Sequence, residues 1–307
     1  MKKGWQFFAD IKHNKYSYIL ALPAIIYTFI FGYLTIPYMV LAFQKYDFQK
    51  GIFGSEFVGF KNFEFFFKSN DASVVIFNTL KLNLLFIVGT TILALVVSVL
   101  LNELKDSFVK RFIQSNYLLP YFMSWIIVSY MMYSLLSYDF GLINKVLTFF
   151  GAEPISFYTE PKYWTAILMI IKMWKDMGFQ VIIYLAVITG FDKTLYEAAK
   201  IDGANRWQMC MKITLPMLMT TITMLTILAI GNIFYGDFGM IYAFVGDNGT
   251  LYSSTDVIDT FMFRTLRMVG NPSQAMAIGL FQAVMGFICV FGTNYIVKKR
   301  FSEGALF

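Results

Sequence analysis

The sequence has 307 residues, 58% of them hydrophobic and only 14% charged, with a formal net charge of +6. A soluble domain carries about a quarter charged residues, so this composition excludes an ordinary soluble protein and indicates a chain embedded in lipid. The positive charge does not indicate nucleic-acid binding, because Lys and Arg lie in connections between apolar runs, the pattern that orients membrane proteins. Cys210 and Cys289 fall in a basic loop and an apolar run, so we expect no disulfide and no metal site.

Six apolar runs approach or exceed the roughly 20 residues that cross a bilayer as a helix. They are residues 18–40, 75–101, 116–136, 165–189, 215–236 and 275–297. The first run, with Pro23 and Pro37, is longer than a signal-peptide core, and no small-residue cleavage site follows it, so we expect an uncleaved span. The sequence therefore predicts an all-α, polytopic membrane protein with six transmembrane helices.

The basic residues give the direction of the spans. They are dense in the arm 1–17, in the connections 102–115 and 190–214, and in the tail 298–307. They are sparser in the longer, aromatic connections 41–74, 137–164 and 237–274. Since Lys and Arg accumulate in cytoplasmic loops, we expect both termini in the cytoplasm.

The last outer connection contains a helix signal. Ser254-Thr255-Asp256 is a plausible helix start, and Val257, Phe261, Phe263 and Leu266 give the following segment an apolar side. This pattern predicts an amphipathic helix at the outer surface. A packing lid without partners is the equally supported alternative.

The cytoplasmic connection 191–216 has the pattern of a helix-turn-helix. Leu195 to Ile201 favours a short helix, and Gly203 permits the left-handed conformation that ends it. A second helical stretch starts near Asn205 and leads into the fifth span, where Pro216 fits an early position. The small Ala residues let a partner approach the backbone closely, while Glu197 and Asp202 offer charge to basic partner residues.

This loop resembles the coupling loop of permeases from binding-protein-dependent ABC importers. Its Glu-Ala-Ala, three residues, Gly, nine residues, Ile, one residue, Leu-Pro spacing is kept without departure. The residues that the resemblance assigns to ATPase docking are Glu197, Ala198, Ala199, Asp202, Gly203, Ile213, Leu215 and Pro216.

The wider sequence is similar to the carbohydrate branch of that family. Ile201 to Ala204 and Ile213 to Pro216 resemble maltose-type permeases. Residues 231–234 and 277–282 resemble polysaccharide or oligosaccharide permeases. The resemblance implies a type I importer transmembrane domain, with a first span at 18–40 and a core of five helices at 75–297, in a bacterial cytoplasmic membrane.

The resemblance also implies partners. They are a second permease subunit, which we expect to be a different protein, two ATPase subunits that use ATP and Mg, and an external solute-binding protein. We expect no cofactor on this chain. ATPase closure would draw the coupling loops together and turn the permeases outward, so that sugar passes from the binding protein into the exposed cavity.

Polar residues within the spans are candidates for the sugar path, since intramembrane charges usually mark a cavity or a pair. Lys172, Asp176, Gln180 and Tyr184 share one helical face of the fourth span. The other candidates are Trp174 beside them, Tyr130 and Tyr133 in the third span, Asn232 and Tyr235 in the fifth, and Gln282 in the sixth. Alternatively, these side chains only form hydrogen bonds with neighbouring helices, and Lys172 and Asp176 form an ion pair with each other.

Three other functions are open to such a chain. The same ABC machinery could carry a non-sugar solute. An ion-coupled secondary transporter would need coupling sites and often internal symmetry, and Lys172, Lys175 and Asp176 could imitate a proton relay. A membrane enzyme is disfavoured, because the sequence lacks a His/carboxylate cluster, a P-loop and a soluble catalytic domain.

Overall fold

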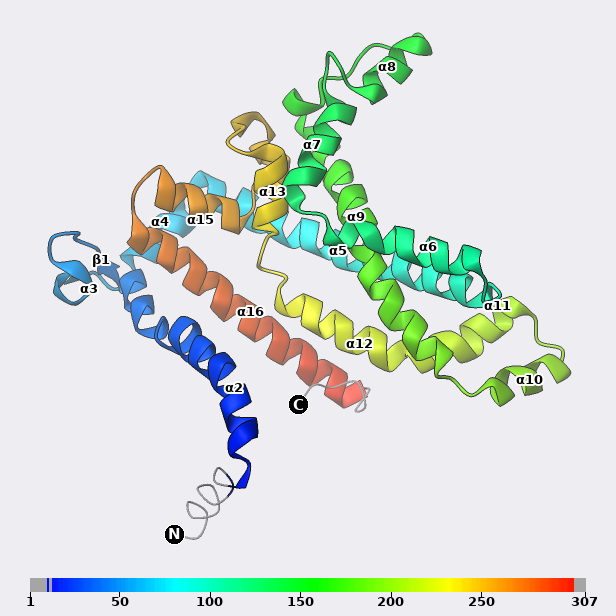
Figure 1. Ribbon diagram of the computed structural model, residues 1–307. Coiled ribbons are helices and arrows are strands. Elements are labelled where there is room, and N and C mark those ends of the chain that lie inside the picture. The colour runs from blue at the N-terminus through cyan, green and yellow to red at the C-terminus, as the bar shows by residue number, and fades with distance from the viewer. Residues whose placement is uncertain (1–9, 11–12, 301–307) are drawn as a thin grey trace.

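The computed structural model describes residues 10 and 13–300, which are mostly helical (Figure 1). Most of the predicted cytoplasmic arm 1–17 and tail 298–307, namely residues 1–9, 11–12 and 301–307, falls outside the described residues. The helices are α2 (Lys15–Thr28), α3 (Gly51–Gly54), α4 (Lys61–Lys68), α5 (Asn70–Glu103), α6 (Phe108–Leu118), α7 (Trp125–Leu136), α8 (Leu142–Phe149), α9 (Trp164–Thr189), α10 (Lys193–Ile201), α11 (Arg206–Met209), α12 (Leu215–Gly231), α13 (Phe238–Val245), α14 (Tyr252–Thr255), α15 (Ile258–Arg267) and α16 (Pro272–Arg300).

Shorter elements join these helices. Two are π-helical, η1 (Phe29–Tyr33) and η6 (Cys210–Thr214), and five are 3-10 helices, η2 (Ile36–Phe43), η3 (Leu119–Phe122), η4 (Phe157–Thr159), η5 (Pro161–Tyr163) and η7 (Gly249–Leu251). Strands β1 (Gln44–Lys45) and β2 (Glu56–Phe57) pair antiparallel, with Gln44 opposite Phe57. This small pair is the exception to the all-α prediction.

Within the described residues, four helices are long and apolar enough to cross a membrane. They are Lys15–Phe43, Asn70–Glu103, Arg206–Gly231 and Pro272–Lys299, and they correspond to the predicted first, second, fifth and sixth spans. The predicted fourth span is the continuous helix α9, but Lys172, Lys175 and Asp176 lie near its middle, so its apolar stretches are interrupted.

The predicted third span, 116–136, is wrong as one straight helix. Residues 108–122 and 125–136 meet at a bend of 101°. Pro120 lies in the 3-10 turn η3, and Ser124 then starts α7 by accepting a hydrogen bond from the Ile127 N–H. A new N-cap directly after a proline turn restarts the helix in a different direction.

Two other predicted boundaries are also wrong. The apolar run 215–236 does not stay helical to its end, because α12 stops at Gly231 and residues 232–237 are irregular before α13. The outer amphipathic helix exists as α15, but it begins at Ile258 rather than directly after Ser254. Val257 and Phe261 of its predicted apolar side are buried, whereas Leu266 is exposed.

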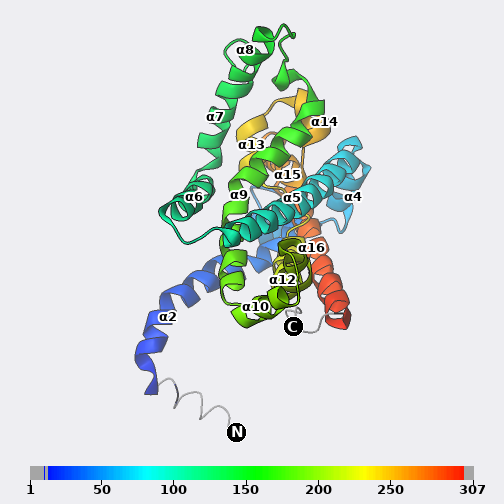
Figure 2. The same ribbon diagram turned by 90° about the vertical axis from the view of Figure 1, so that its right-hand side faces the viewer.

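Three apolar clusters hold the helices together. One surrounds Trp164, where α5, α7, α9 and α13 meet, and a second surrounds Tyr184 between α5, α9 and α12. The third surrounds Phe66 and joins α4, α5, α15 and α16. Helix α9 therefore contributes to two clusters, and it connects the part of the molecule near α8 with α10 (Figure 2).

Helix α2 lies apart from this bundle. It diverges from the other helices in both views (Figures 1 and 2), and none of its residues is buried. The chain joins the bundle only at η2, where Leu41 and Ala42 are buried. The start of α2, the end of α16 and α10 lie toward the same end of the molecule, and α8 lies at the opposite end (Figures 1 and 2).

Candidate functional site

The loop between α9 and α12 forms a helical hairpin at one end of the molecule (Figure 1). Helix α10 begins at Asp192, whose carboxylate accepts a hydrogen bond from the Thr194 N–H at 2.9 Å. This bond lowers the pKa of Asp192, because it favours the charged carboxylate. The helix predicted over Leu195–Ile201 is thus confirmed, with two additional residues at its start.

Gly203 makes the turn of the hairpin. Its φ is +80°, a conformation that costs an L-residue about 1–2 kcal/mol but glycine almost nothing. The Gly203 and Ala204 N–H groups donate to the carbonyls of Lys200 and Ala199 at 3.1 and 2.9 Å, which closes the end of α10. The predicted helix stop is confirmed.

A capping box starts the second helix of the hairpin. Asn205 accepts from the Gln208 N–H, and the Gln208 side chain accepts from the Asn205 N–H, both at 2.8 Å. Helix α11 then passes through the π-helical turn η6 into α12, with Pro216 in the first turn of α12. The second helix of the hairpin is therefore continuous with α12, one of the helices that are long and apolar enough to cross a membrane.

The tip of the hairpin presents an exposed surface. Glu197, Ala198, Asp202 and Gly203 are all exposed, whereas Ala199 is half-buried. Two large apolar side chains accompany them, Ile201 at 87% exposure and Trp207 at 71%. Large exposed apolar groups beside charged ones are typical of a protein-binding surface. Trp207 and Ile201 are docking candidates that the motif alone did not indicate.

The remaining motif residues lie at the base of the hairpin. Ile213 and Leu215 are half-buried, and Pro216 is exposed at the start of α12. Between them Thr214 is buried and lies 3.0 Å from the Tyr196 hydroxyl of α10. These positions support the hairpin rather than form its tip.

A salt bridge and a cleft mark where the hairpin meets the bundle. Arg206 lies 3.3 Å from Glu103 at the end of α5. A cleft of about 520 Å³ separates α10 from the ends of α5 and α9. Its lining residues are Asn102, Glu103, Ile188, Thr189, Phe191, Lys193, Tyr196, Glu197, Lys200, Arg206 and Met209. The hairpin thus contacts the bundle at its base and leaves its tip free.

The polar stripe predicted on α9 is only partly exposed. Lys172 lies 2.8 Å from Asp176, as their spacing allowed, and 2.6 Å from Asp237 before α13. Gln180 is half-buried, and Tyr184 is completely buried in the cluster between α5, α9 and α12. Lys172 and Asp176, the first two residues of the stripe, therefore belong to a charge cluster, whereas Tyr184, its last residue, belongs to the apolar core.

The irregular segment 232–237 is held by side chains from three other helices. Asn83 of α5 donates to the carbonyls of Ile233 and Tyr235, both at 2.9 Å. Gln282 of α16 donates to the Phe234 carbonyl at 2.9 Å, and Asp259 of α15 accepts from the Gly236 N–H at 2.5 Å. Unpaired backbone groups between membrane helices cost several kcal/mol each, so these bonds allow the segment to stay non-helical.

The other predicted path residues differ in their surroundings. Tyr130, Tyr133, Trp174, Asn232 and Tyr235 are exposed on this chain. Gln282 is 1% exposed, and its amide is used by Phe234 and Asp259. Gln282 therefore supports the irregular segment, whereas the five exposed side chains remain free to face a cavity.

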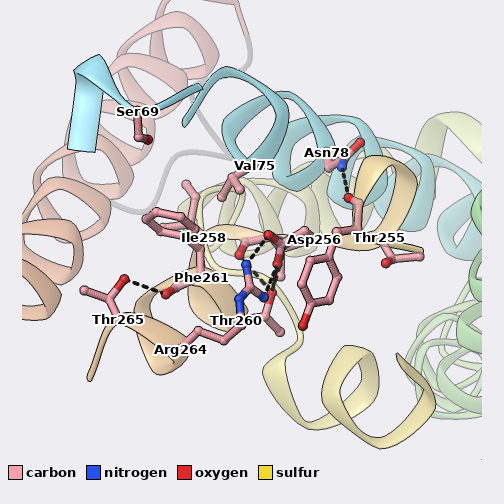
Figure 3. A network of polar contacts seen from close by, with 12 residues as sticks. Ser69, Val75, Asn78, Thr255, Asp256, Ile258, Thr260, Phe261, Arg264 and Thr265 are labelled. Atoms are coloured by element: carbon pink, nitrogen blue, oxygen red, sulfur yellow. Dashed lines mark hydrogen bonds and ion pairs between the residues drawn. The ribbon is translucent and has the colours of Figure 1, made fainter. Parts of the chain in front are cut away.

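A second polar network lies near the opposite end of α5 from the hairpin (Figure 3). The Arg264 guanidinium donates to both oxygens of Asp256 at 2.8 and 2.5 Å, and the Thr260 hydroxyl donates to Asp256 at 2.6 Å. Burial opposes the charge of Arg264, but the bonds and charge of Asp256 outweigh it and raise the pKa of Arg264. The Arg264 guanidinium also lies over the Tyr252 ring at 4.1 Å, so α14 and α15 are joined.

Sequence reasoning missed the roles of Asn83, Asp237 and Asp259. All three belong to the irregular segment or bind it, and their partners lie up to 152 residues away in the chain. The sequence signal was a Gly236-Asp237 pair at the end of an apolar run, which resembles an N-cap. Among the described residues no group of His, Cys, Asp and Glu is arranged to hold a metal ion.

Comparison with known proteins gives a consistent result. Residues 87–303 match the family described as Binding-protein-dependent transport system inner membrane component. The chain is 37% identical over 291 residues to the polygalacturonan/rhamnogalacturonan transport system permease protein YteP of Bacillus subtilis, covering 95% of this chain and 90% of YteP. It is 35% identical over 302 residues to Protein LplB of the same organism, and the match covers 98% of this chain and 94% of LplB.

A solved structure agrees with these relatives. The chain superimposes on a subunit of a bacterial ABC transporter for import of the acidic polysaccharide alginate with a TM-score of 0.87. The two are 31% identical, and the match covers 96% of this chain and 99% of the other. The same kind of transporter is known in complex with a pentasaccharide-bound periplasmic protein, with a TM-score of 0.86 and 31% identity.

The fold and the hairpin define a multi-pass transport component of a membrane rather than an enzyme. The chain belongs to the binding-protein-dependent transport system inner membrane component family. The resemblance inferred from the loop motif is thereby confirmed, and the location in the cytoplasmic membrane with it.

Proposed function

We propose that this chain is one of two permease subunits of an ABC importer that takes up oligosaccharides. The single observation that carries the proposal is the hairpin α10–α11. It presents Glu197, Ala198 and Gly203 on a capped, rigid tip between two membrane helices, in a member of a family of transport components. ATP and Mg are used by partner ATPases, and this hairpin docks into one of them.

The membrane topology follows from the same hairpin. The six spans are α2 with η1 and η2, α5, the bent pair α6–α7, α9, α11–α12 and α16. The hairpin and both termini lie in the cytoplasm. Support comes from the basic residues of 1–17, 102–115 and 190–214 and from the common end toward which α10, the start of α2 and the end of α16 lie (Figures 1 and 2).

The partners complete the machine. A second permease, a different protein, faces this chain, and an external binding protein delivers the cargo. Closure of the ATPases moves the hairpin, and only contacts that differ between the two states shift the equilibrium between them. The capped ends of α10 and the Tyr196–Thr214 contact give the hairpin the stiffness that such a lever needs.

The cargo path lies beside the irregular segment. Asn232, Tyr235 and Trp174 offer an amide, a hydroxyl and aromatic faces to sugar rings, and Asp176 offers a carboxylate. Tyr130 and Tyr133 of α7 add two exposed phenols. This combination suits a sugar, whose hydroxyls need hydrogen-bond partners and whose ring faces pack on aromatics.

The cargo class is an acidic oligosaccharide. The similar solved transporter imports the acidic polysaccharide alginate, and YteP is named for transport of polygalacturonan and rhamnogalacturonan. Lys175 adds a buried positive charge to this region: its ammonium bonds the Tyr121 carbonyl at 2.9 Å, and no carboxylate among the described residues lies within salt-bridge distance of it. A matched pair of charged and neutral oligosaccharides offered to the external binding protein tests the cargo.

Two hairpin variants test the docking. Gly203→Pro forces φ away from +80° and removes the N–H that bonds Lys200, and Glu197→Arg reverses a charge at the tip. Both variants should reach the membrane yet lose uptake, while Glu153→Gln, an exposed acid of another connection, keeps it. Normal uptake by both hairpin variants at normal expression contradicts the docking role.

A further inference from the structure

Helix α9 is linked at two places to the part of the chain that contains α12 and α13. At one end the hairpin α10–α11 joins them through the chain. Farther along α9, toward its middle, Lys172 lies 2.6 Å from Asp237, which follows α12 across the irregular segment and caps α13. A displacement of the hairpin that shifts α9 along α12 therefore acts on the Lys172–Asp237 contact.

The environment of Lys172 is mostly protein. Its side chain is 19% exposed, and those of Asp176 and Asp237 are 28% and 23% exposed. The ammonium lies over the Trp125 ring of α7 at 5.3 Å, and Lys175 lies over the same ring at 4.8 Å. An ion pair in such surroundings is screened much less than one in water.

The contact between Lys172 and Asp237 can open without leaving the Lys172 cation unpaired. Asp176 lies four residues after Lys172 on the same helix and moves with it. Asp237 keeps its second role as N-cap of α13, because its Oδ1 accepts from the Met240 N–H at 3.0 Å. Opening thus leaves Lys172 paired with Asp176 and Asp237 partly exposed with one backbone hydrogen bond, so it costs less than breaking a solitary, fully buried pair.

The neighbouring segment can act as the hinge. Residues 232–236 are bound by Asn83 and Gln282, which come from helices α5 and α16 rather than from α9. When the ion pair opens, these bonds keep the start of the segment in place while the N-terminal end of α13, at Asp237, is freed from Lys172; the apolar contacts of α13 around Trp164 remain. In hinge motions, the changes in backbone φ and ψ are concentrated in a few loop residues or residues at the ends of helices, such as those of this segment.

We propose that the Lys172–Asp237 ion pair is a reversible latch between α9 and α13, closed in this structure and opened during the transport cycle. The latch rests on the proposed function, because the force that opens it comes from an ATPase docked on the hairpin. Asp176 has the opposite role to Asp237. It receives the Lys172 charge when the latch opens, and so it makes opening easier.

Two single substitutions of similar size test the latch by the sign of their effects. Asp237→Asn keeps an N-cap oxygen for Met240 but removes the charge, so the latch cannot close. Asp176→Asn leaves Lys172 with Asp237 alone, so the latch cannot open without an unpaired cation. In the reconstituted complex, Asp237→Asn should raise ATP hydrolysis without binding protein about fivefold, and Asp176→Asn should lower stimulated hydrolysis about fivefold.

The control is Glu64→Gln, which removes an exposed ion pair with Lys68 on α4 and should leave hydrolysis unchanged. If Asp237→Asn does not assemble, Asp237→Ser replaces it, because Ser also serves as an N-cap. Shifts of both variants in the same direction, or no shift in Asp176→Asn, overturn the latch. A wild-type complex purified without an ATPase contradicts the proposed function instead, so the two failures are distinguishable.

Discussion

The Lys172 ammonium neutralises two carboxylates that belong to different parts of the fold. Its Nζ lies 2.8 Å from Asp176 on the same helix and 2.6 Å from Asp237 at the start of α13. Lys172 is shared by two acids, and no other cation lies within salt-bridge distance of them among the described residues, so each of the three groups depends on the others. The cluster is therefore sensitive to the loss of its only member that contacts both acids.

Replacing Lys172 by Met should destabilise the chain more than either of the neutral acid variants. The substitution leaves two partly buried carboxylates close to each other, and removing one partner of a buried pair costs about 3–5 kcal/mol. We expect a reduced amount of assembled protein in the membrane, measured by gel filtration of the detergent extract.

The triple variant Lys172→Met, Asp176→Asn, Asp237→Asn is the matched comparison, because it removes the repulsion together with the cation. It should recover assembly but not uptake. If Lys172→Met alone assembles like the wild type, the charges of this cluster do not depend on one another.

Asn83→Leu should loosen the irregular segment after α12. Both hydrogen bonds of the Asn83 amide go to this segment, and the substitution leaves the carbonyls of Ile233 and Tyr235 without a partner. Each unsatisfied buried group costs about 1–3 kcal/mol. Thermal unfolding of the purified complex should therefore begin at a lower temperature.

The control for this prediction is Asn116→Leu, whose amide is exposed and bonds only the preceding turn of its own helix. An unfolding temperature that drops equally in the two variants would show that the loss is not specific to the irregular segment.

Gly178→Ala should separate α9 from the end of α6. A Cβ on Gly178 would lie 2.4 Å from the Tyr117 carbonyl oxygen, and backbone cannot move aside as a flexible side chain can. Forced overpacking typically costs about 1–3 kcal/mol. Gly292→Ala on α16 is the counterpart, because nothing lies within 4 Å of its added Cβ. Protease resistance of the folded protein should fall only in the first variant.

The hairpin could be predicted from the sequence because its determinants are local. Gly203 ends α10, and Asn205 with Gln208 starts α11, so each boundary depends on residues within a few positions. Its exposed tip followed from the same spacing. The large apolar residues Ile201 and Trp207 were not singled out, since their exposure depends on how the hairpin projects from the bundle.

The irregular segment could not be predicted, because its determinants are distant. Ile233, Phe234 and Tyr235 continue the apolar pattern of α12, and the glycines on either side of them, Gly231 and Gly236, do not by themselves end a membrane helix, where Gly is frequent. The segment is non-helical because Asn83, 150 residues away from Ile233, supplies hydrogen bonds that replace those of a helix. The bend at Pro120 is an intermediate case, since membrane helices often tolerate proline without breaking.

The last prediction concerns the network of Asp256 and Arg264 (Figure 3). The Asp256 side chain is 5% exposed, and both of its oxygens accept from Arg264. Arg264→Met therefore leaves a buried carboxylate with only the Thr260 hydroxyl, a loss of about 3–5 kcal/mol. The double variant Arg264→Met, Asp256→Asn removes the charge as well, and it should be nearly as stable as the wild type, because replacing a whole buried pair is often neutral.

Cleavage of the 246–271 segment by an added protease measures this difference, since α14 and α15 lie within it. The single variant should be cut faster than the wild type and the double variant at nearly the wild-type rate. The Arg264 guanidinium of the wild type stays charged between pH 6 and 9, because this whole range lies about three units or more below the ordinary pKa of Arg, so the wild-type cleavage rate should gain no pH dependence from Arg264. Equal cleavage of the single and double variants would mean that the Arg264 side chain acts by packing on Tyr252, at 4.1 Å, and not by its charge.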